Sequence, residues 1–464
     1  MRHAAAAVAA ALLFVLAGCA APAAQPSLRD GWQWPEDPAT DRIGFEDGVW
    51  YNESIDVDQS DGLTARERRL FVARTMARVE RIRGLEFDRR VPVEVIGREE
   101  YRTRSVFTGG RSGAYHAWHN QVWEAALVVG EGENVSGAFD ALYGGSVAGY
   151  YTPANDRIVV VSDSARPSMD RGTLAHELVH ALQDQRFGIA GAGSRDAALA
   201  HDGLTEGDAR YVETLYEQRC EANWSCIATP ASADADNSNG SDGSTASVDR
   251  GLFTYIYQPY ADGPGFVHRL RERGGWAAVN EAYADPPAST EQTIHPERYP
   301  EEGVAAVSVA DRSAAGWSRF DLPRTTERLG ETGVYAMFRA QATINRSHLR
   351  TDDVAYSPYN YSHPLSTGWA GDRLVPYRSG TGESAEYGYV WALRWDTAAD
   401  ATEFADGYRA TLRSLGAERV RAGVFEVPDG PFADAFRVER RGRTVVITNA
   451  PTAGQLDAVH APAS

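Results

Sequence analysis

The segment Gly172–Gln185 constrains this chain more than any other, because it carries two histidines one helical turn apart. His176 and His180 are four residues apart, so on an α-helix both side chains project from the same face. Apolar residues recur at helical spacing through the segment, and no proline interrupts it. The sequence therefore predicts a helix here, which begins near Asp170 and ends near Gly188.

Glu177 adds a third chemical group to this predicted helix. It is rotated by about 100° from His176, so its carboxylate can reach a water on a metal but is poorly placed to bind the metal itself. Two imidazoles at this spacing are typical zinc ligands, and a carboxylate beside them is a typical general base. The His-Glu-x-x-His pattern therefore predicts Zn²⁺ bound by His176 and His180, with Glu177 as the catalytic base.

A catalytic zinc needs a third protein ligand and an open coordination position. Glu206 is the favoured candidate, because it lies 26 residues after His180, early on the next predicted helix, from which its carboxylate could return across the cleft. Gly207 beside it would give room for a second helix to approach closely. Asp202 and Glu213 are the alternatives, and an acid near a helix start can also serve only the helix dipole.

Two motifs together suggest a family. His176-Glu-Leu-Val-His180 with Glu-Gly-Asp-Ala at 206–209 resembles the gluzincin branch of zinc metallopeptidases. More narrowly, the chain is similar to a family of haloarchaeal surface lipoproteins with a metalloprotease domain. A hairpin from Tyr150, the run Glu-Leu-Val-His-Ala-Leu-Gln-Asp-Gln and the segment Ser289–Tyr299 carry this likeness.

This resemblance implies a zincin-like fold, with His176, His180 and Glu206 as ligands of Zn²⁺ and Glu177 as the base. The chain departs from the best-known gluzincins in the wider gap before its third ligand. It also has Arg210 one turn after Glu206, where an acid would serve as partner of the histidines.

Peptide hydrolysis also needs a second donor for the oxyanion that forms during attack. His295 or Tyr299 could supply it, and of the two we favour His295 as a catalytic residue. Either side chain could instead only fill space or cap its loop.

The predicted fold class is α+β, with a zincin-like metallopeptidase domain at residues 64–303 and a C-terminal α+β domain at 304–464. Strands at 147–152 and 157–162 form a hairpin just before the motif helix. In zincins, such an edge strand pairs with the backbone of the substrate. Further predicted elements are helices at 64–84, 113–129, 263–283 and 399–415, a helix from His201 capped near Thr205, a strand at 388–395 and a hairpin at 435–448.

The N-terminus predicts export. Residues 1–18 read as a signal peptide, because Arg2 precedes an apolar run too short to span a bilayer stably. The run ends in Leu-Ala-Gly-Cys19, which resembles the lipobox of secreted lipoproteins. We therefore expect a lipid anchor at Cys19 on the outer face of the cytoplasmic membrane, followed by a tether and acidic segment at 19–63.

Composition fits a surface protein. The formal net charge is −18 and the chain contains no lysine, which disfavours a nucleic-acid partner and favours a salt-loving source. The two remaining cysteines, Cys220 and Cys226, predict a small disulfide loop in an exported chain. Residues 220–249 are rich in Ala, Ser, Asp, Asn and Gly and predict a mobile acidic insertion.

Two functions follow from these patterns. The first is a lipid-anchored, zinc-dependent peptidase that hydrolyses peptides or proteins outside the cell. The second is a surface or envelope binding lipoprotein that keeps the zincin fold without activity. The intact Glu177 favours the first, whereas the large C-terminal domain without a catalytic motif keeps the second open.

Overall fold

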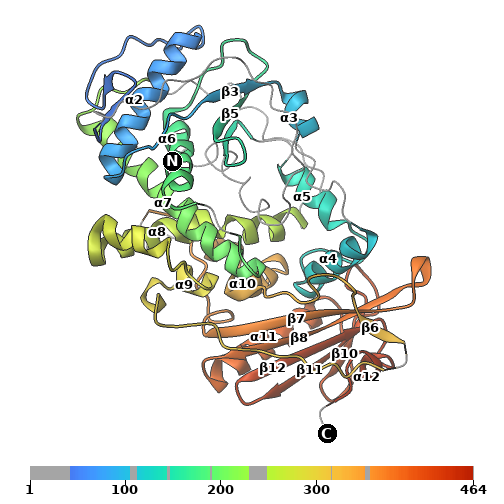
Figure 1. The fold of residues 1–464 in the computed structure, drawn as a ribbon. Coiled ribbons are helices and arrows are strands. Elements are labelled where there is room, and N and C mark those ends of the chain that lie inside the picture. The colour runs from blue at the N-terminus through green and yellow to red at the C-terminus, as the bar shows by residue number, and fades with distance from the viewer. Residues whose placement is uncertain are drawn as a thin grey trace.

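The chain forms an α+β structure, as predicted, in which a helical part with a small sheet adjoins a larger sheet (Figure 1). The predicted signal peptide and Cys19 lie outside the described residues. No helix in the described part of the chain has the length and apolar character needed to cross a membrane. The computed structural model describes residues 42–104, 112–143, 147–188, 191–228, 248–314, 316–350 and 356–462.

The N-terminal part starts with a short ribbon, β1 (Phe45–Glu46) and β2 (Val49–Trp50), which leads into helix α2 (Ala65–Arg83). A capping box starts α2, since Thr64 and Glu67 each bond the other's backbone N–H. This confirms the helix predicted from residue 64.

A three-stranded sheet follows, in the order β3-β5-β4. Strand β3 (Val93–Ile96) runs parallel to β5 (Arg157–Val161), and β4 (Gly149–Thr152) pairs with β5 as an antiparallel hairpin. The predicted hairpin is therefore confirmed, with β4 at the edge of the sheet. The chain between β3 and β4 contains α3 (Arg98–Arg104), α4 (Gly113–Ala125) and α5 (Val135–Tyr143).

The motif helix is α6 (Arg171–Phe187), and α7 (Arg195–Ala222) follows it closely. The predicted start of α7 at His201 is wrong. Ser194 caps the helix by accepting from the N–H of Ala197, while the hydroxyl of Thr205 donates to carbonyls inside the helix. A threonine that bonds to the preceding turn is compatible with a helix interior, so it did not mark a helix start.

The helix after the acidic stretch, α8 (Val248–Ala282), is longer than predicted and breaks at Gly274 and Gly275. The predicted insertion at 220–249 is too long at both ends, because Cys220 lies in α7 and Val248 begins α8. Residues 229–247 lie outside the described residues. Two short helices, α9 (Thr290–Ile294) and η2 (Pro296–Arg298), lead toward the C-terminal part.

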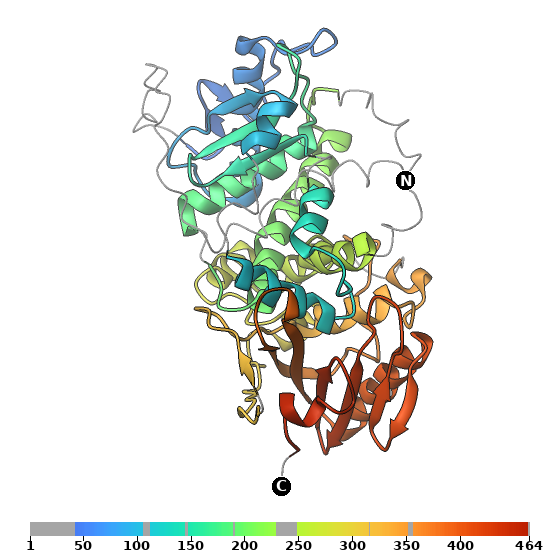
Figure 2. The same ribbon diagram turned by 90° about the vertical axis from the view of Figure 1, so that its right-hand side faces the viewer.

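The C-terminal part is built on a seven-stranded antiparallel sheet of order β6-β7-β8-β12-β11-β10-β9 (Figure 2). Alternate residues of β8 face opposite sides, so that Trp391 joins the larger core and Val390 the smaller one. Helices α4, α10 and α11 contribute to the larger core, while α12 contributes to the smaller core. The elements are β6 (Trp317–Arg319), α10 (Gly330–Ala340), η3 (Arg346–Leu349), β7 (Trp369–Ser379), η4 (Gly382–Ser384), β8 (Glu386–Trp395), α11 (Ala398–Ser414), β9 (Glu418–Arg421), β10 (Val424–Glu426), β11 (Ala435–Arg441), β12 (Thr444–Ala450) and α12 (Leu456–Val459).

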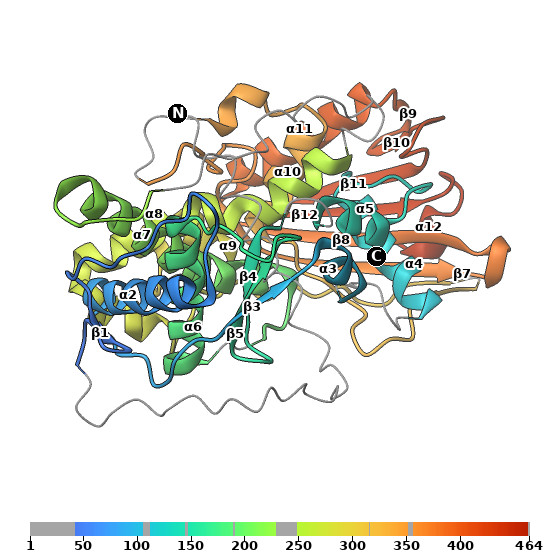
Figure 3. The same cartoon turned by 90° about the horizontal axis from the view of Figure 1, so that it is seen from above.

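The two parts share core residues. Leu199 of α7 and Leu252 of α8 pack in the same apolar cluster as Trp391 of the large sheet. A second cluster joins α2, the small sheet, α6 and α7. Helix α7 therefore contributes to both cores. Seen from above, α2 and α6 lie on one side of the molecule and the large sheet lies on the other (Figure 3).

Candidate metal centre

Helix α6 holds the motif residues on a buried face. Its first turn is fixed by Asp170, whose side chain accepts from the N–H of Thr173 at 2.8 Å, and it ends at Gly188 with a φ of 72°. These are the boundaries that the sequence predicted. Burial of the leucine stripe beside the motif holds this helix in the second core, so the side chains of His176 and His180 are only 5% and 1% exposed.

Glu206 reaches the two histidines from α7. Its Oε2 atom lies 3.1 Å from Nε2 of His176 and 3.3 Å from Nε2 of His180, and the two Nε2 atoms are 3.1 Å apart. All three side chains are buried. The residues predicted as metal ligands are therefore brought together in one cluster.

This triangle has the dimensions of a metal site. Ligand atoms at about 2.0–2.1 Å around a tetrahedral zinc are separated from each other by about 3.3 Å. The three measured separations are close to that value, so His176, His180 and Glu206 can occupy one face of such a tetrahedron. Two imidazole nitrogens and one carboxylate oxygen also form a common donor set of catalytic zinc.

Second partners fix both imidazole rings. Nδ1 of His176 donates to Oε2 of Glu213 at 3.3 Å, and Nδ1 of His180 donates to Oε1 of Gln183 at 2.9 Å. In the neutral form, each ring would present the lone pair of its Nε2 to Glu206, so three electron-pair donors would converge on one point. A cation at that point would relieve their mutual repulsion, and this supports the fit to zinc.

Neither of these two partners was predicted from the sequence. Gln183 lies three residues after His180 and is itself held by the carbonyl of Thr205 at 2.9 Å. Glu213 was predicted only as an alternative ligand. It supplies the acid partner of a histidine that position 210 lacks, and Arg210 donates to it at 2.6 Å. The helical spacing contained both signals, since positions three and seven residues apart share a face.

Asp202 does not join the ligand cluster in the described structure. It lies one turn before Glu206 on α7, where burial raises the pKa of its carboxyl well above the usual value and the charge of Glu206 adds to this effect. Gly207 has the predicted role, because a Cβ atom there would lie 2.4 Å from the backbone of Gly263 on α8. The absence of that atom lets α7 and α8 approach closely beside Glu206.

The charges of the site differ between its two glutamates. Burial would raise the pKa of Glu206, but the charge of His180 and hydrogen bonds from both histidines lower it to about 2. Burial raises the pKa of Glu177 to about 7, although both histidines oppose the shift. Glu206 thus stays ionised as a ligand should, while Glu177 can exchange a proton near neutral pH.

Strand β4 positions Glu177. Oε2 of Glu177 accepts from the backbone N–H of Tyr151 at 2.8 Å, while Oε1 is buried without a hydrogen-bond partner among the described residues. Val161 donates to the carbonyl of Ala148, so the N–H of Tyr151 points away from β5. The outer edge of β4 therefore faces the predicted base.

The two candidates for the oxyanion donor have other partners. Nε2 of His295 lies 3.1 Å from Oε1 of Glu331 on α10, and its Nδ1 faces Glu297. The hydroxyl of Tyr299 donates to the carbonyl of Asp285 at 2.7 Å. The side-chain atoms that would donate to an oxyanion therefore already have hydrogen-bond partners. Neither residue belongs to the ligand cluster.

The predicted disulfide lies at the end of α7, where Cys220 and Cys226 are joined with their Cα atoms 5.6 Å apart. The guanidinium of Arg78 donates to the sulfur of Cys226 at 3.2 Å and stacks over Trp224. This loop closes over the C-terminal turns of α7.

Comparison with known families bears on the large sheet only. A family model described as a domain of unknown function (DUF8575) matches residues 318–460, the region from β6 to α12. No curated protein and no solved structure matches the chain.

Proposed function

We propose that the protein is a zinc-dependent peptidase whose zincin-like domain spans residues 64–303. The convergence of His176, His180 and Glu206 at mutual distances of 3.1–3.3 Å carries this proposal. The resemblance to gluzincins supports it, since the same three positions are the ligands that the resemblance implies. We further propose that the chain is exported and anchored by a lipid at Cys19.

The residues present fit the chemistry of hydrolysis. Zinc in a site of this kind supplies a bound water of lowered pKa and polarises a carbonyl group. Glu177 would accept a proton from the attacking water and pass it to the leaving amine. Its pKa of about 7 allows Glu177 both to accept and to release a proton near neutral pH. The N–H of Tyr151 holds its carboxylate in position.

The outer edge of β4 supports a peptide as the substrate. Gly149 presents its backbone groups, and Tyr151 its carbonyl, away from β5, and an extended peptide can pair with such an edge as an added strand. The pairing would bring a peptide carbonyl next to Glu177, since this strand already contacts the base.

One observation favours the second candidate, a binding protein without activity. The side chains of His176, His180 and Glu206 are 5%, 1% and 0% exposed, whereas a catalytic zinc needs a coordination position that water or substrate can reach. In that case the metal would only stabilise the domain, and the protein would act through a binding surface elsewhere.

The substitution Glu177→Gln separates the two functions. We expect the wild-type chain in high salt to hold one zinc by mass spectrometry of metals and to cleave an unfolded protein. The variant should keep its zinc but lose activity by a factor of about 10² or more, because amide cannot accept the proton.

Glu221→Gln is the matched control, an exposed glutamate on α7 whose loss should leave both zinc content and cleavage unchanged. Full zinc occupancy without cleavage of a broad peptide library by the wild type would favour the binding protein. A chain that takes up no zinc would refute the peptidase.

A further inference from the structure

A second group of acids lies where the loop after α4 meets the large sheet. Glu124 is in the last turn of α4, Glu131 follows in the loop, and Asp434 directly precedes β11. One carboxylate oxygen of each lies within 4.8 Å of the others. The backbones also meet here, because the N–H of Glu131 donates to the carbonyl of Pro431 at 3.0 Å.

These three carboxyl groups have no counter-charge in the described structure, and burial raises the pKa of each of them. Glu124 is 3% exposed and Asp434 is 2% exposed, and no described arginine or histidine forms an ion pair with either of them or with Glu131. Carboxylates this close repel strongly where water is excluded. Burial of such a group without a counter-charge lowers the stability of the fold.

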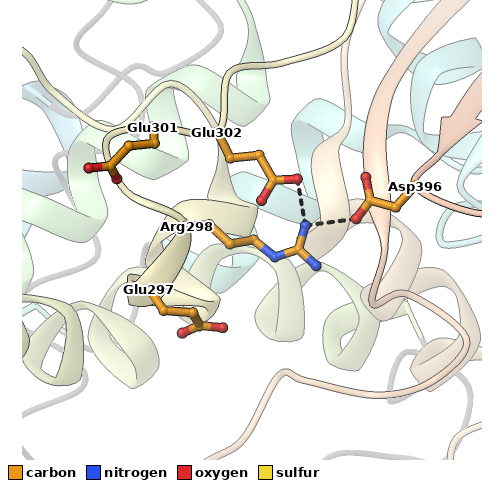
Figure 4. A pocket seen from close by; sticks show the side chains of 5 residues that line it. All are labelled: Glu297, Arg298, Glu301, Glu302 and Asp396. Carbon is orange, nitrogen blue, oxygen red and sulfur yellow. Dashed lines mark hydrogen bonds and ion pairs between the residues drawn. The ribbon is translucent and has the colours of Figure 1, made fainter.

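The same chain contains a comparable group that is neutralised. Glu291, Glu302 and Asp396 surround Arg298, whose Nη1 atom donates to all three at 2.8, 2.9 and 2.8 Å. Figure 4 shows the guanidinium between Glu302 and Asp396. A cation thus occupies the centre of that cluster, and the cluster of Glu124 lacks an equivalent among the described residues.

Two buried amides give an independent indication. The amide nitrogen of Gln121 donates to Glu124, and that of Asn449 donates to Asp434 at 2.7 Å. Gln121 and Asn449 are only 4% and 0% exposed. Their carbonyl oxygens, Oε1 and Oδ1, are buried without a partner in the described structure. Rotation by half a turn exchanges oxygen and nitrogen of a carboxamide, and would turn both unpartnered oxygens toward the acids.

We propose that Glu124, Glu131 and Asp434, with the amide oxygens of Gln121 and Asn449, bind a calcium ion. Ca²⁺ takes about 6–8 oxygen ligands in flexible geometry, and carboxylates with amide oxygens are its usual set. Zinc prefers nitrogen and sulfur, so this oxygen-only site is distinct from the histidine cluster.

The ion would connect the two parts of the molecule. Glu124 and Glu131 belong to the segment around α4, whereas Asp434 and Asn449 belong to the large sheet. Glu131 is exposed, which gives the ion a route from solvent and leaves room for water ligands. Calcium binding therefore stabilises the junction between α4 and the sheet.

The test uses the full chain at fixed salt, freed of metal, with Ca²⁺ alone as the added ion. Ca²⁺ should raise the melting temperature by on the order of 5 °C. Terbium should bind in its place and luminesce on excitation of Tyr389, which pairs with Asn449 across β8 and β12.

Glu131→Gln should weaken the Ca²⁺ response at least tenfold, and since Glu131 is exposed this variant should fold. Asp434→Asn should abolish the response, whereas Glu302→Gln in the Arg298 cluster should leave it intact. A wild type that ignores Ca²⁺, or a Glu131→Gln variant that responds like the wild type, would overturn the proposal.

Discussion

Two acids on α7 contact the two ring nitrogens of His176. Glu206 lies against Nε2 and Glu213 lies against Nδ1, so the ring is held from both sides. Burial lowers the pKa of His176, but hydrogen bonds and charges from both acids raise it to about 10. Glu213 therefore makes the ring more basic, which in other metal sites strengthens the bond to the ion.

Replacement of Glu213 by alanine should weaken zinc binding by a factor of about 10–100, because Nδ1 of His176 loses its acceptor. Competition with a coloured chelator measures this change. Glu217→Ala is the control: Glu217 lies one turn further on α7 and pairs with Arg171 at 2.7 Å instead of a histidine. Equal zinc affinity in the two variants would mean that the contact to Glu213 does not orient the ligand.

At the scale of elements, the site depends on the close approach of α7 and α8. Gly203 and Gly207 of α7 face Gly263 of α8, and a Cβ on Gly263 would lie 2.3 Å from the carbonyl of Gly203. No side chain fits between these backbones. The separation of the two helices is thus set by glycine, next to the ligand Glu206.

Gly207→Ala should therefore destabilise the fold by about 1–3 kcal/mol, since the added methyl group overlaps the backbone of Gly263. It should also reduce zinc content, because α7 must shift and carry Glu206 with it. Denaturant unfolding and metal analysis measure both effects.

Gly137→Ala in α5 is the matched control, as its nearest neighbour would be 3.9 Å from the new atom. Alanine favours a helix more than glycine does, so a loss of stability to the same extent in both variants would mean that the approach of α8 is not responsible.

Much of the site and part of the fold could be predicted from the sequence. The boundaries of α6 followed from Asp170 and Gly188, because helix caps are local signals. The start of α7 did not, since the cap at Ser194 lies in a Gly- and Ala-rich stretch without periodicity. Strand β7 was not predicted, because it contains Pro376 and most of its residues are buried. Its sequence therefore lacks the alternation of apolar and polar residues that indicates a strand.

The partners of the oxyanion candidates could not be predicted either. The segment from Ser289 to Tyr299 is polar, and the sequence does not show that His295 meets Glu331 of α10. Such contacts join residues far apart in the chain, and helical or strand periodicity has no bearing on them.

At the scale of the whole molecule, Arg298 connects the helices to the large sheet. It bonds Glu291 of α9 and Glu302 on one side and Asp396, which follows β8, on the other. The guanidinium is partly exposed, whereas the carboxylate of Glu291 is nearly buried. The ion pairs of Arg298 therefore form only when the helices and the large sheet are correctly placed against each other.

Arg298→Ala should lower the free energy of unfolding by on the order of 2 kcal/mol, because three acids would then lie together without a cation. Urea unfolding at constant salt measures the change. Arg269→Ala is the control, as the pair of Arg269 with Glu272 is exposed on both sides and should contribute little. Equal stability of the two variants would mean that Arg298 does not hold the junction.

The hydrogen bond from Tyr151 to Glu177 is made by a main-chain N–H, a group that every residue except proline possesses. Mutational drift at position 151 can replace the ring that contacts Asp156 and Asp184, yet the strand will still hold the acid. Only a proline codon would release it. The link between this hairpin and the motif helix is thus inherited through the path of the backbone and not through the identity of any side chain.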